Sequence, residues 1–466
     1  MAVACLGMTM SFLTITATLT ALSSITSDLG LGPVELVWTS SAYALALAAF
    51  VLSSGALGDL FGRRTVLLAG TAVLGAGAVL TASAGSATVL IVGEVVMGAG
   101  AALIVPNSLA IVSGAFTDPR RRASAVGVWA ACSGIGLAVG PIAAGLLLSA
   151  FSWHAVFLVD VVVAVLVLAA APFVVPNTRV AGRGIDLPGT ALATLAVAAL
   201  VVGVVEGGRS GFGSPVPVLG FVLAVAAGAG FVLVERVVAR PVVDLAAFAA
   251  PRTVGALLVS AVALFTFTGL GLLTTLEMQR AQGLSALASG VRLLPLMAAY
   301  VVASSLAALA VRRAGIRPVV LLGLFATVVG TLVLHQTGPG SAYASTAVGF
   351  VLVGSGLGLL IAPTTALVVG SVPAERTGMA GSAVTTVRQV GGALGGSVLG
   401  TVVTNRLAGH LADGDAAPLA LTSAVHDGLL VAAGVLLLTL LATAVLLRAP
   451  RASTTTAIET PEGIPA

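Results

Sequence analysis

Long runs of apolar residues recur along the whole chain, and they restrict its fold more than any other feature. A helix that crosses a membrane needs about 20 apolar residues. Charged residues make up only 8% of the 466, too few to cover the surface of a soluble protein of this length. The chain is therefore predicted to be an all-α integral membrane protein with fourteen transmembrane helices. They lie near residues 4–26, 36–57, 65–83, 88–112, 124–148, 155–175, 189–206, 217–235, 254–276, 286–309, 318–336, 343–370, 380–404 and 428–448.

The arginines indicate which ends of these helices face the cytoplasm. All 21 basic residues are arginines, and basic loop residues gather on the cytoplasmic side of a membrane. With a cytoplasmic N-terminus, the opposite side holds only Arg209, Arg280 and Arg406. The cytoplasmic side holds sixteen, namely Arg63, Arg64, Arg120, Arg121, Arg122, Arg179, Arg183, Arg236, Arg240, Arg252, Arg312, Arg313, Arg317, Arg376, Arg448 and Arg451. We predict a multi-pass protein of the inner (plasma) membrane with both termini cytoplasmic.

Patterns typical of enzymes and of nucleic-acid binding are missing from the sequence. The arginines are scattered in small groups between apolar runs, so no basic face for nucleic acid is predicted. There is no Gly-rich phosphate loop followed by lysine, no H-E-x-x-H and no G-x-S-x-G. Cys5 and Cys132 lie singly in apolar runs, and the histidines lie in loops or at span ends: His154, His335, His410 and His426. We predict no enzyme activity, catalytic residue, metal or cofactor. A sensor or scaffold is disfavoured because no loop is long enough for a signalling domain.

A charged, glycine-rich motif joins the second and third predicted helices. It contains Gly55, Gly58, Asp59, Gly62, Arg63 and Arg64. Glycines permit a tight crossing between two helices, and the acid and arginines can form pairs that break when helices move. The motif resembles the G-x-L-x-D-x-x-G-R-R loop of the major facilitator superfamily. The resemblance implies a transporter in which these residues gate a conformational change.

The fifth predicted helix carries Gly136, Gly140, Pro141 and Gly145. Proline kinks a helix, and neighbouring glycines let another helix approach closely. The pattern is similar to the motif that marks antiporting exporters within this superfamily. Further pieces resemble the fourteen-helix drug:proton antiporter branch, as found in actinomycete antibiotic exporters. They are Phe151–Phe157, Asp186–Gly189, Gly283–Ala286, Val372–Gly378 and Thr386–Gly395.

The resemblance implies a fold of two six-helix bundles with two extra central helices. A weak repeat supports this fold, since Gly58–Gly70 and Arg312–Gly323 are similar runs that follow the second and tenth helices. The expected domains are an N-terminal bundle over 1–175, two linking helices with their connections over 176–252, and a C-terminal bundle over 253–448. A disordered cytoplasmic tail is expected over 449–466.

Two positions depart from the branch. In this branch the first helix usually carries an aspartate, where this chain has Thr14, and the fourth helix usually carries an arginine, where this chain has Glu94. An ionised acid inside a membrane is costly and is often functional. Glu94 and Asp160 are therefore the proton-coupling candidates, with a structural polar role left open for each. Thr14, Arg388 and Gln389 are expected to form a polar network between helices.

The predicted function is secondary-active export of hydrophobic small molecules, such as drugs or antibiotics, by proton antiport and alternating access. A metabolite importer or facilitator on the same fold, and an exporter that is not coupled to protons, remain alternatives. The expected partners are a hydrophobic substrate, protons and membrane lipid, without nucleic acid, and the protein is expected to be a monomer. Glu206 and Glu277 are expected to be solvated at outer span ends, and Arg292 to reach toward the outer surface.

Overall fold

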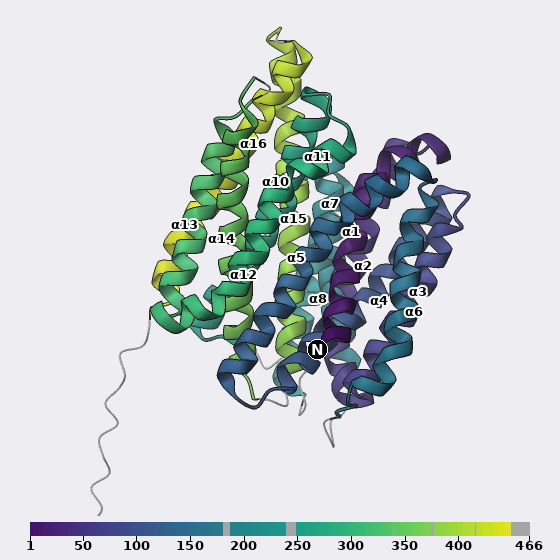
Figure 1. Cartoon of the computed structure of the whole chain (residues 1–466), viewed down its shortest axis with the longest axis vertical. Helices are drawn as coiled ribbons and strands as arrows, with labels where there is room; N and C mark the ends of the chain where they lie inside the picture. Colours follow the sequence, from purple (N-terminus) through teal and green to yellow (C-terminus); the bar gives the residue numbers. More distant parts are fainter. Residues whose placement is uncertain (180–186, 239–247, 339, 374–376, 415, 449–466) are drawn as a thin grey trace, which may run out of the picture.

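The computed structural model describes residues 1–179, 187–238, 248–338, 340–373, 377–414 and 416–448, and all the regular structure among them is helical (Figure 1). The predicted tail over 449–466, together with Arg183, Asp186, Arg240, Arg376 and Arg451, lies outside the described residues. Fourteen described helices have 20 or more residues. They are α1 Ala2–Leu29, α2 Pro33–Phe61, α3 Arg63–Ala82, α4 Ala87–Gly114, α5 Pro119–Ala150, α6 His154–Val174, α7 Leu187–Ser210, α8 Pro215–Val237, α10 Pro251–Leu276, α12 Leu294–Ala314, α13 Ile316–His335, α14 Tyr343–Gly370, α15 Thr377–Ala412 and α16 Ala417–Leu446. Two short helices, η1 Glu277–Ala281 and α11 Ala286–Arg292, precede α12.

Local sequence signals begin and end several of these helices. The Ser86 and Asp118 side chains accept hydrogen bonds from the backbone N–H groups of Val89 and Arg120, and so cap the first turns of α4 and α5. Proline occupies the first turn of several helices, where its missing N–H is not needed; among them are α2, α5, α8, α10, α12 and α16. Gly30 ends α1 in the left-handed conformation.

Twelve of the described helical segments are long and apolar enough to cross a membrane. Helix α2 makes a thirteenth if Ala42–Val51 and Ser53–Phe61, bent by 56° to each other, form one span. Helix α15 is not among them, and it carries Arg388, Gln389 and Arg406 along its 36 residues. The exact count of fourteen spans stays a prediction.

Apolar side chains cover the outside of the molecule, as lipid contact requires. Val237 is 86% exposed and Val225 72% exposed, both on α8, while Leu438 on α16 is 69% exposed. Charged side chains such as Glu94 and Arg388 are buried instead. This inverted arrangement is typical of helical membrane proteins, in which polar groups face the bundle interior.

The helices pack in two groups that lie side by side (Figure 1). In the first helix group, α1 to α6, α4 packs on α2 and α3, and α1 packs on α5 and α6. In the second helix group, α10 to α16, α14 packs on α12 and α13, and α15 packs on α10 and α16. The groups meet where α5 contacts α11, α12 and α14, and where α15 contacts α2 and α4. Helix α7 pairs with α8 and contacts both α2 and α15. The domain boundaries predicted from the sequence stay a prediction.

Candidate functional site

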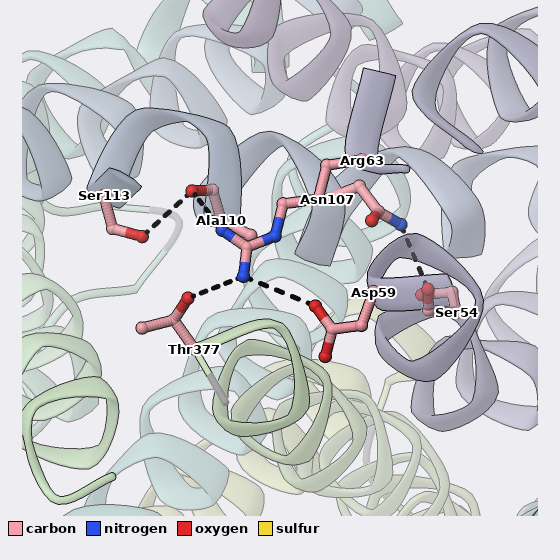
Figure 2. A network of polar contacts seen from close by, with 7 residues as sticks. All are labelled: Ser54, Asp59, Arg63, Asn107, Ala110, Ser113 and Thr377. Atoms are coloured by element: carbon pink, nitrogen blue, oxygen red, sulfur yellow. Dashed lines mark hydrogen bonds and ion pairs between the residues drawn. The ribbon is translucent and has the colours of Figure 1, made fainter. Parts of the chain in front are cut away.

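The Asp59–Arg63 pair lies where α2 and α3 meet, and we call this end of the molecule the motif end. Arg63 Nη2 lies 3.3 Å from Asp59 Oδ1, and both side chains are buried. Arg63 Nη1 donates to the backbone oxygen of Ala110 on α4 at 3.2 Å. Arg63 Nη2 also donates to the hydroxyl of Thr377, the first residue of α15, at 3.3 Å (Figure 2). One guanidinium thus joins the first helix group to the second.

Asn107 on α4 braces α2 next to this pair. Its Nδ2 donates to the backbone oxygens of Ser54, at 3.2 Å, and Leu103, at 2.8 Å. A Cβ added at Gly58 would overlap with the Asn107 amide. The glycine is therefore required for the close approach of α2 and α4, and Gly55 is buried one turn before it.

The rest of the motif fixes the turn between α2 and α3. Gly62 has φ 99°, a backbone conformation that favours glycine, and an added Cβ there would collide with Asn177. Arg64 Nη1 donates to the backbone oxygens of Pro172, at 3.0 Å, and Val175, at 3.2 Å, at the end of α6. The motif residues therefore contact α4, α6 and α15. A loop whose charges only set the orientation of the protein in the membrane does not need these contacts.

The glycines of α5 face α1 and α11. A Cβ added at Gly136 or Gly140 would collide with the backbone of α1 or with Thr16, and one at Gly145 would lie 2.9 Å from Leu287 Cδ1 on α11. Pro141 lies inside α5, which stays helical on both sides of it, and Gly290 packs against its ring. These small residues let α5 contact both helix groups closely.

Two acids lie buried together inside the first helix group. Glu94 on α4 is 0% exposed, and its Oε1 accepts a hydrogen bond from the Thr18 hydroxyl on α1 at 2.9 Å. Asp160 on α6 is 1% exposed, stands next to Thr14, and is close enough to Glu94 for their charges to interact. Tyr43 on α2 lies near both acids and donates its hydroxyl to a backbone oxygen of α1. We call Glu94, Asp160, Thr14, Thr18 and Tyr43 the acid cluster.

No opposite charge from the described residues lies beside the acid cluster. Among the described residues, no arginine or histidine lies within ion-pairing distance of either acid. Glu94 Oε2 and Asp160 Oδ1 are buried and accept no hydrogen bond from the described residues. A charged carboxylate in this position is costly.

A narrow cavity lies where the two helix groups meet. Its walls come from α1, α4 and α5 on one side and from α10, α12, α14 and α15 on the other. The polar side chains in the wall are Ser133, Tyr300, Thr385, Arg388 and Gln389. The cavity holds about 20 Å³, which is room for a water molecule and not for a drug-sized ligand. The conformation is therefore closed at this level.

The predicted residues thus fall into four places rather than one, and the first is the contact of α5 with α1 and α11, where Gly136, Gly140, Pro141 and Gly145 lie. The motif residues lie at one end of the molecule, Glu94 and Asp160 lie in the acid cluster, and Arg388 with Gln389 lines the cavity. Thr14 belongs to the acid cluster, so the predicted network of Thr14 with Arg388 and Gln389 is divided between two sites. Glu94 contacts α1 through Thr18, one turn away from Thr14.

Several other residues differ from the expectation or were missed. Glu206 and Glu277 are buried, at 5% and 7% exposure, and are not solvated. Arg292 packs over the Tyr343 ring and donates to Gln282 at 3.2 Å, so it is held by protein groups. Asn107, Thr18, Tyr43 and Tyr300 were not singled out from the sequence. A buried polar side chain in an apolar span is the signal that identifies Asn107 and the two tyrosines.

Metal-binding side chains do not gather in the part of the chain that the structure describes. No group of three or more histidine, cysteine or acidic side chains there is placed to hold a metal ion. Cys5 and Cys132 are free.

Comparison with known proteins identifies the family. A family model described as Major Facilitator Superfamily matches residues 4–396. The chain belongs to the Major Facilitator Superfamily. This membership makes it a membrane transporter rather than an enzyme, in agreement with the expectation from the motif between α2 and α3.

Relatives and solved structures agree with this membership. The multidrug resistance protein Stp of Mycobacterium tuberculosis is 34% identical over 407 residues, which cover 87% of this chain and 76% of Stp. The puromycin resistance protein pur8 of Streptomyces alboniger is 33% identical over 429 residues, 90% of this chain and 85% of pur8. The crystal structure of the human organic anion transporter MFSD10 superposes with a TM-score of 0.70 at 17% identity, covering 95% of this chain and 98% of that one. At that identity the likeness concerns the fold alone.

Proposed function

We propose that this transporter exports hydrophobic small molecules, such as drugs or antibiotics, in exchange for protons. The observation that carries the proton coupling is the acid cluster. Glu94 and Asp160 are fully buried, lack an opposite charge among the described residues, and each have a carboxylate oxygen without a hydrogen-bond partner there. A proton bound in this cluster is released when the cluster gains access to water, since solvation favours the charged carboxylate.

Export is the direction that the relatives favour. The names of Stp and pur8 describe resistance, and the tetracenomycin C resistance and export protein of Streptomyces glaucescens is named for export. The glycine-and-proline pattern of α5, which packs this helix against α1 and α11, agrees with that direction.

Alternating access is the mechanism we infer for the movement. The cavity between the helix groups is too small for a substrate, so the groups must separate for binding and release. They are joined at the motif end by Arg63 and Thr377 and toward the opposite end by α5 and α11. In this mechanism the two contacts open in turn, and the Asp59–Arg63 pair holds the closed arrangement of the motif end.

The membrane arrangement is part of the same proposal. We infer fourteen spans, with α2 and α15 each crossing the bilayer, and two six-helix bundles linked by α7 and α8. The motif end faces the cytoplasm, and both termini lie there. The bias of the arginines toward that side supports this orientation.

Two experiments test the proposal. A susceptibility panel in a drug-sensitive host, with and without the protein, identifies an exported compound. Proton release driven by that compound is then measured in vesicles reconstituted with the parent or with Glu94→Gln. Glutamine keeps the shape of a protonated glutamate and cannot release a proton, so we expect substrate binding without proton release. Asp118→Asn, which changes an exposed acid at the start of α5, is the matched control and retains release. Equal proton release from the parent and Glu94→Gln places the coupling site elsewhere.

A further inference from the structure

Arg388 places a positive charge in the wall of the cavity between the helix groups. It lies on α15 and lines the cavity with residues of both groups, including Phe12 of the first and Leu264 of the second. The side chain is buried, at 7% exposure. An arginine side chain stays protonated in proteins, so the cavity carries a full positive charge.

The hydrogen bonds of Arg388 use only part of its guanidinium group. Nη2 donates to the backbone oxygen of Ile361 at 2.9 Å and to the hydroxyl of Thr365, both on α14. Nε is buried and has no hydrogen-bond partner among the described residues. A purely structural link between α14 and α15 needs only the Nη2 bonds, so it leaves the buried Nε without an explanation.

No negative charge in the described structure balances Arg388. None of the described acids lies within ion-pairing distance of its guanidinium group. The described residues of the cavity wall include no acid, and their remaining polar groups are hydroxyls and the amide of Gln389. Glu94 and Asp160 belong to the acid cluster and do not line the cavity. A buried charge of this kind is normally paired, and here the place of the missing partner is the cavity.

We propose that the cavity selects hydrophobic organic anions, with Arg388 as the group that binds the carboxylate or phenolate of the substrate. The inference rests on the proposed export function and names its substrate class. When the helix groups separate, the apolar wall, with Phe12, Leu264 and Phe267, contacts the body of the substrate. The guanidinium donates charged hydrogen bonds to its anionic group. A cation of the same size is repelled, because no acid of the wall offsets Arg388.

The test compares two probes that differ in charge and share a fluorophore. They are 1-pyrenebutyrate, an anion, and 1-pyrenebutyl-trimethylammonium, a cation. Binding to the purified full-length protein in neutral detergent micelles is followed by fluorescence anisotropy, with empty micelles as the blank. The variants are Arg388→Gln, Arg388→Lys and Ser133→Asp, which adds a carboxylate to the opposite wall of the cavity. Gel filtration and thermal melting verify that each variant is folded.

We expect the parent to bind the anion at least about tenfold more tightly than the cation, the range that one charged hydrogen bond supplies. Arg388→Gln abolishes this preference, Arg388→Lys keeps part of it, and Ser133→Asp lowers it while Arg388 is intact. A parent that binds both probes equally, prefers the cation or binds neither overturns the proposal. A preference for the anionic probe that persists in both Arg388→Gln and Ser133→Asp also overturns the proposal.

The outcomes separate this inference from the proposed function. If the parent exports a compound in the susceptibility panel but prefers the cationic probe, export stands and the anion site is wrong. If the anion preference depends on Arg388 but no compound is exported, the site stands and the export proposal is wrong.

Discussion

Gly58 and Asn107 form a contact that a single methyl group disrupts. The Asn107 amide occupies the space beside Gly58 that any side chain would need, and it donates to the backbone of α2 at Ser54. The contact lies next to the Asp59–Arg63 pair, which joins the two helix groups at the motif end (Figure 2). The fit between α2 and α4 therefore bears directly on the closed arrangement of that end.

Gly58→Ala is expected to abolish most transport while the protein still reaches the membrane. The added Cβ overlaps with the Asn107 amide, so α2 and α4 must separate or Asn107 must leave its two hydrogen bonds. Adding Asn107→Ala to Gly58→Ala removes the overlap and restores part of the activity. Resistance of a drug-sensitive host to the exported compound measures each variant. Gly370→Ala, at a glycine with open space around it, is the control. Full resistance in Gly58→Ala contradicts the proposed fit.

The acid cluster places an acid beside Thr14, the position at which the resemblance to the drug:proton antiporter branch implies an aspartate on α1. Here Thr14 stands next to Asp160 on α6. A carboxyl group thus occupies nearly the same place from a different helix. If position in space matters for coupling, moving the acid back to α1 preserves the function.

Asp160→Asn is expected to reduce substrate-driven proton release, and the double change Thr14→Asp with Asp160→Asn to restore much of it. The double variant keeps two acids in the cluster and exchanges which helix carries one of them. Thr14→Asn with Asp160→Asn has nearly the same shape without the second acid, and it restores nothing. Reconstituted vesicles with a pH-sensitive dye measure the release. Parent-like release from Asp160→Asn alone excludes Asp160 from the coupling site.

At the residue scale, the sequence identified the acids and could not identify their surroundings. Glu94 and Asp160 were predicted because acids inside apolar spans are rare and costly. Thr18 and Tyr43 were missed, because hydroxyls are common in membrane helices and only the packing of α1, α2, α4 and α6 brings them to the acids. Buried Glu206 was also missed, since its place near a span end suggested contact with water.

At the scale of helices, Pro141 makes α5 less stable than an uninterrupted helix. Proline supplies no N–H for the preceding turn and costs about 3 kcal/mol relative to alanine inside a helix. The ring also packs against Gly290, at the contact between α5 and α11. A helix weakened at this point bends more easily when the helix groups move.

Pro141→Ala is expected to raise the melting temperature and to lower the rate of transport. Alanine restores the backbone hydrogen bond and stiffens α5, which opposes the bending that we infer for each transport cycle. Pro172→Ala is the matched control, because Pro172 lies inside α6 near an exposed end, away from the helix-group contact, and contacts Arg64 through its backbone oxygen, which alanine keeps. It is expected to leave transport unchanged. Thermal melting measures the change in stability, and efflux rates measure the change in transport. A Pro141→Ala variant that transports as fast as the parent contradicts the role of the proline.

Hydropathy predicted the positions of the helices more accurately than the residues at which they begin and end. The predicted stretch 286–309 is divided into α11 and α12 at Leu293, since Pro295 belongs to the first turn of α12. Helix α16 begins at Ala417 and not near 428. His426 and Asp427 interrupt its apolar run, but Asp427 pairs with Arg406 at 3.4 Å and the helix continues. Hydropathy detects the apolar part of a helix and not its polar extensions.

At the scale of the whole molecule, the closed conformation depends on contacts between residues far apart in the sequence. Arg63 and Thr377 are separated by 314 positions, and Gly145 and Leu287 come from the two helix groups. No periodicity in the sequence predicts such pairs. The family resemblance supplied the arrangement of the groups, and the structure supplies the contacts that must open. Alternating access requires the contact between α5 and α11 to open once in every cycle.

A disulfide introduced by the double substitution Gly145→Cys with Leu287→Cys is therefore expected to stop transport. A Cβ at position 145 lies 3.4 Å from that of Leu287, close to the separation of about 3.8 Å in disulfides. The native Cys5 and Cys132 are replaced by alanine in the background. Oxidation should abolish efflux in membrane vesicles, and a reductant should restore it, so the reduced protein reports the effect of the substitutions alone. Gly323→Cys with Leu359→Cys, whose Cβ atoms lie 3.1 Å apart, joins α13 and α14 within the second helix group. Its oxidation should leave transport intact, because helices within one group need not separate. Undiminished efflux from the protein fully cross-linked between positions 145 and 287 would show that this contact stays closed during transport.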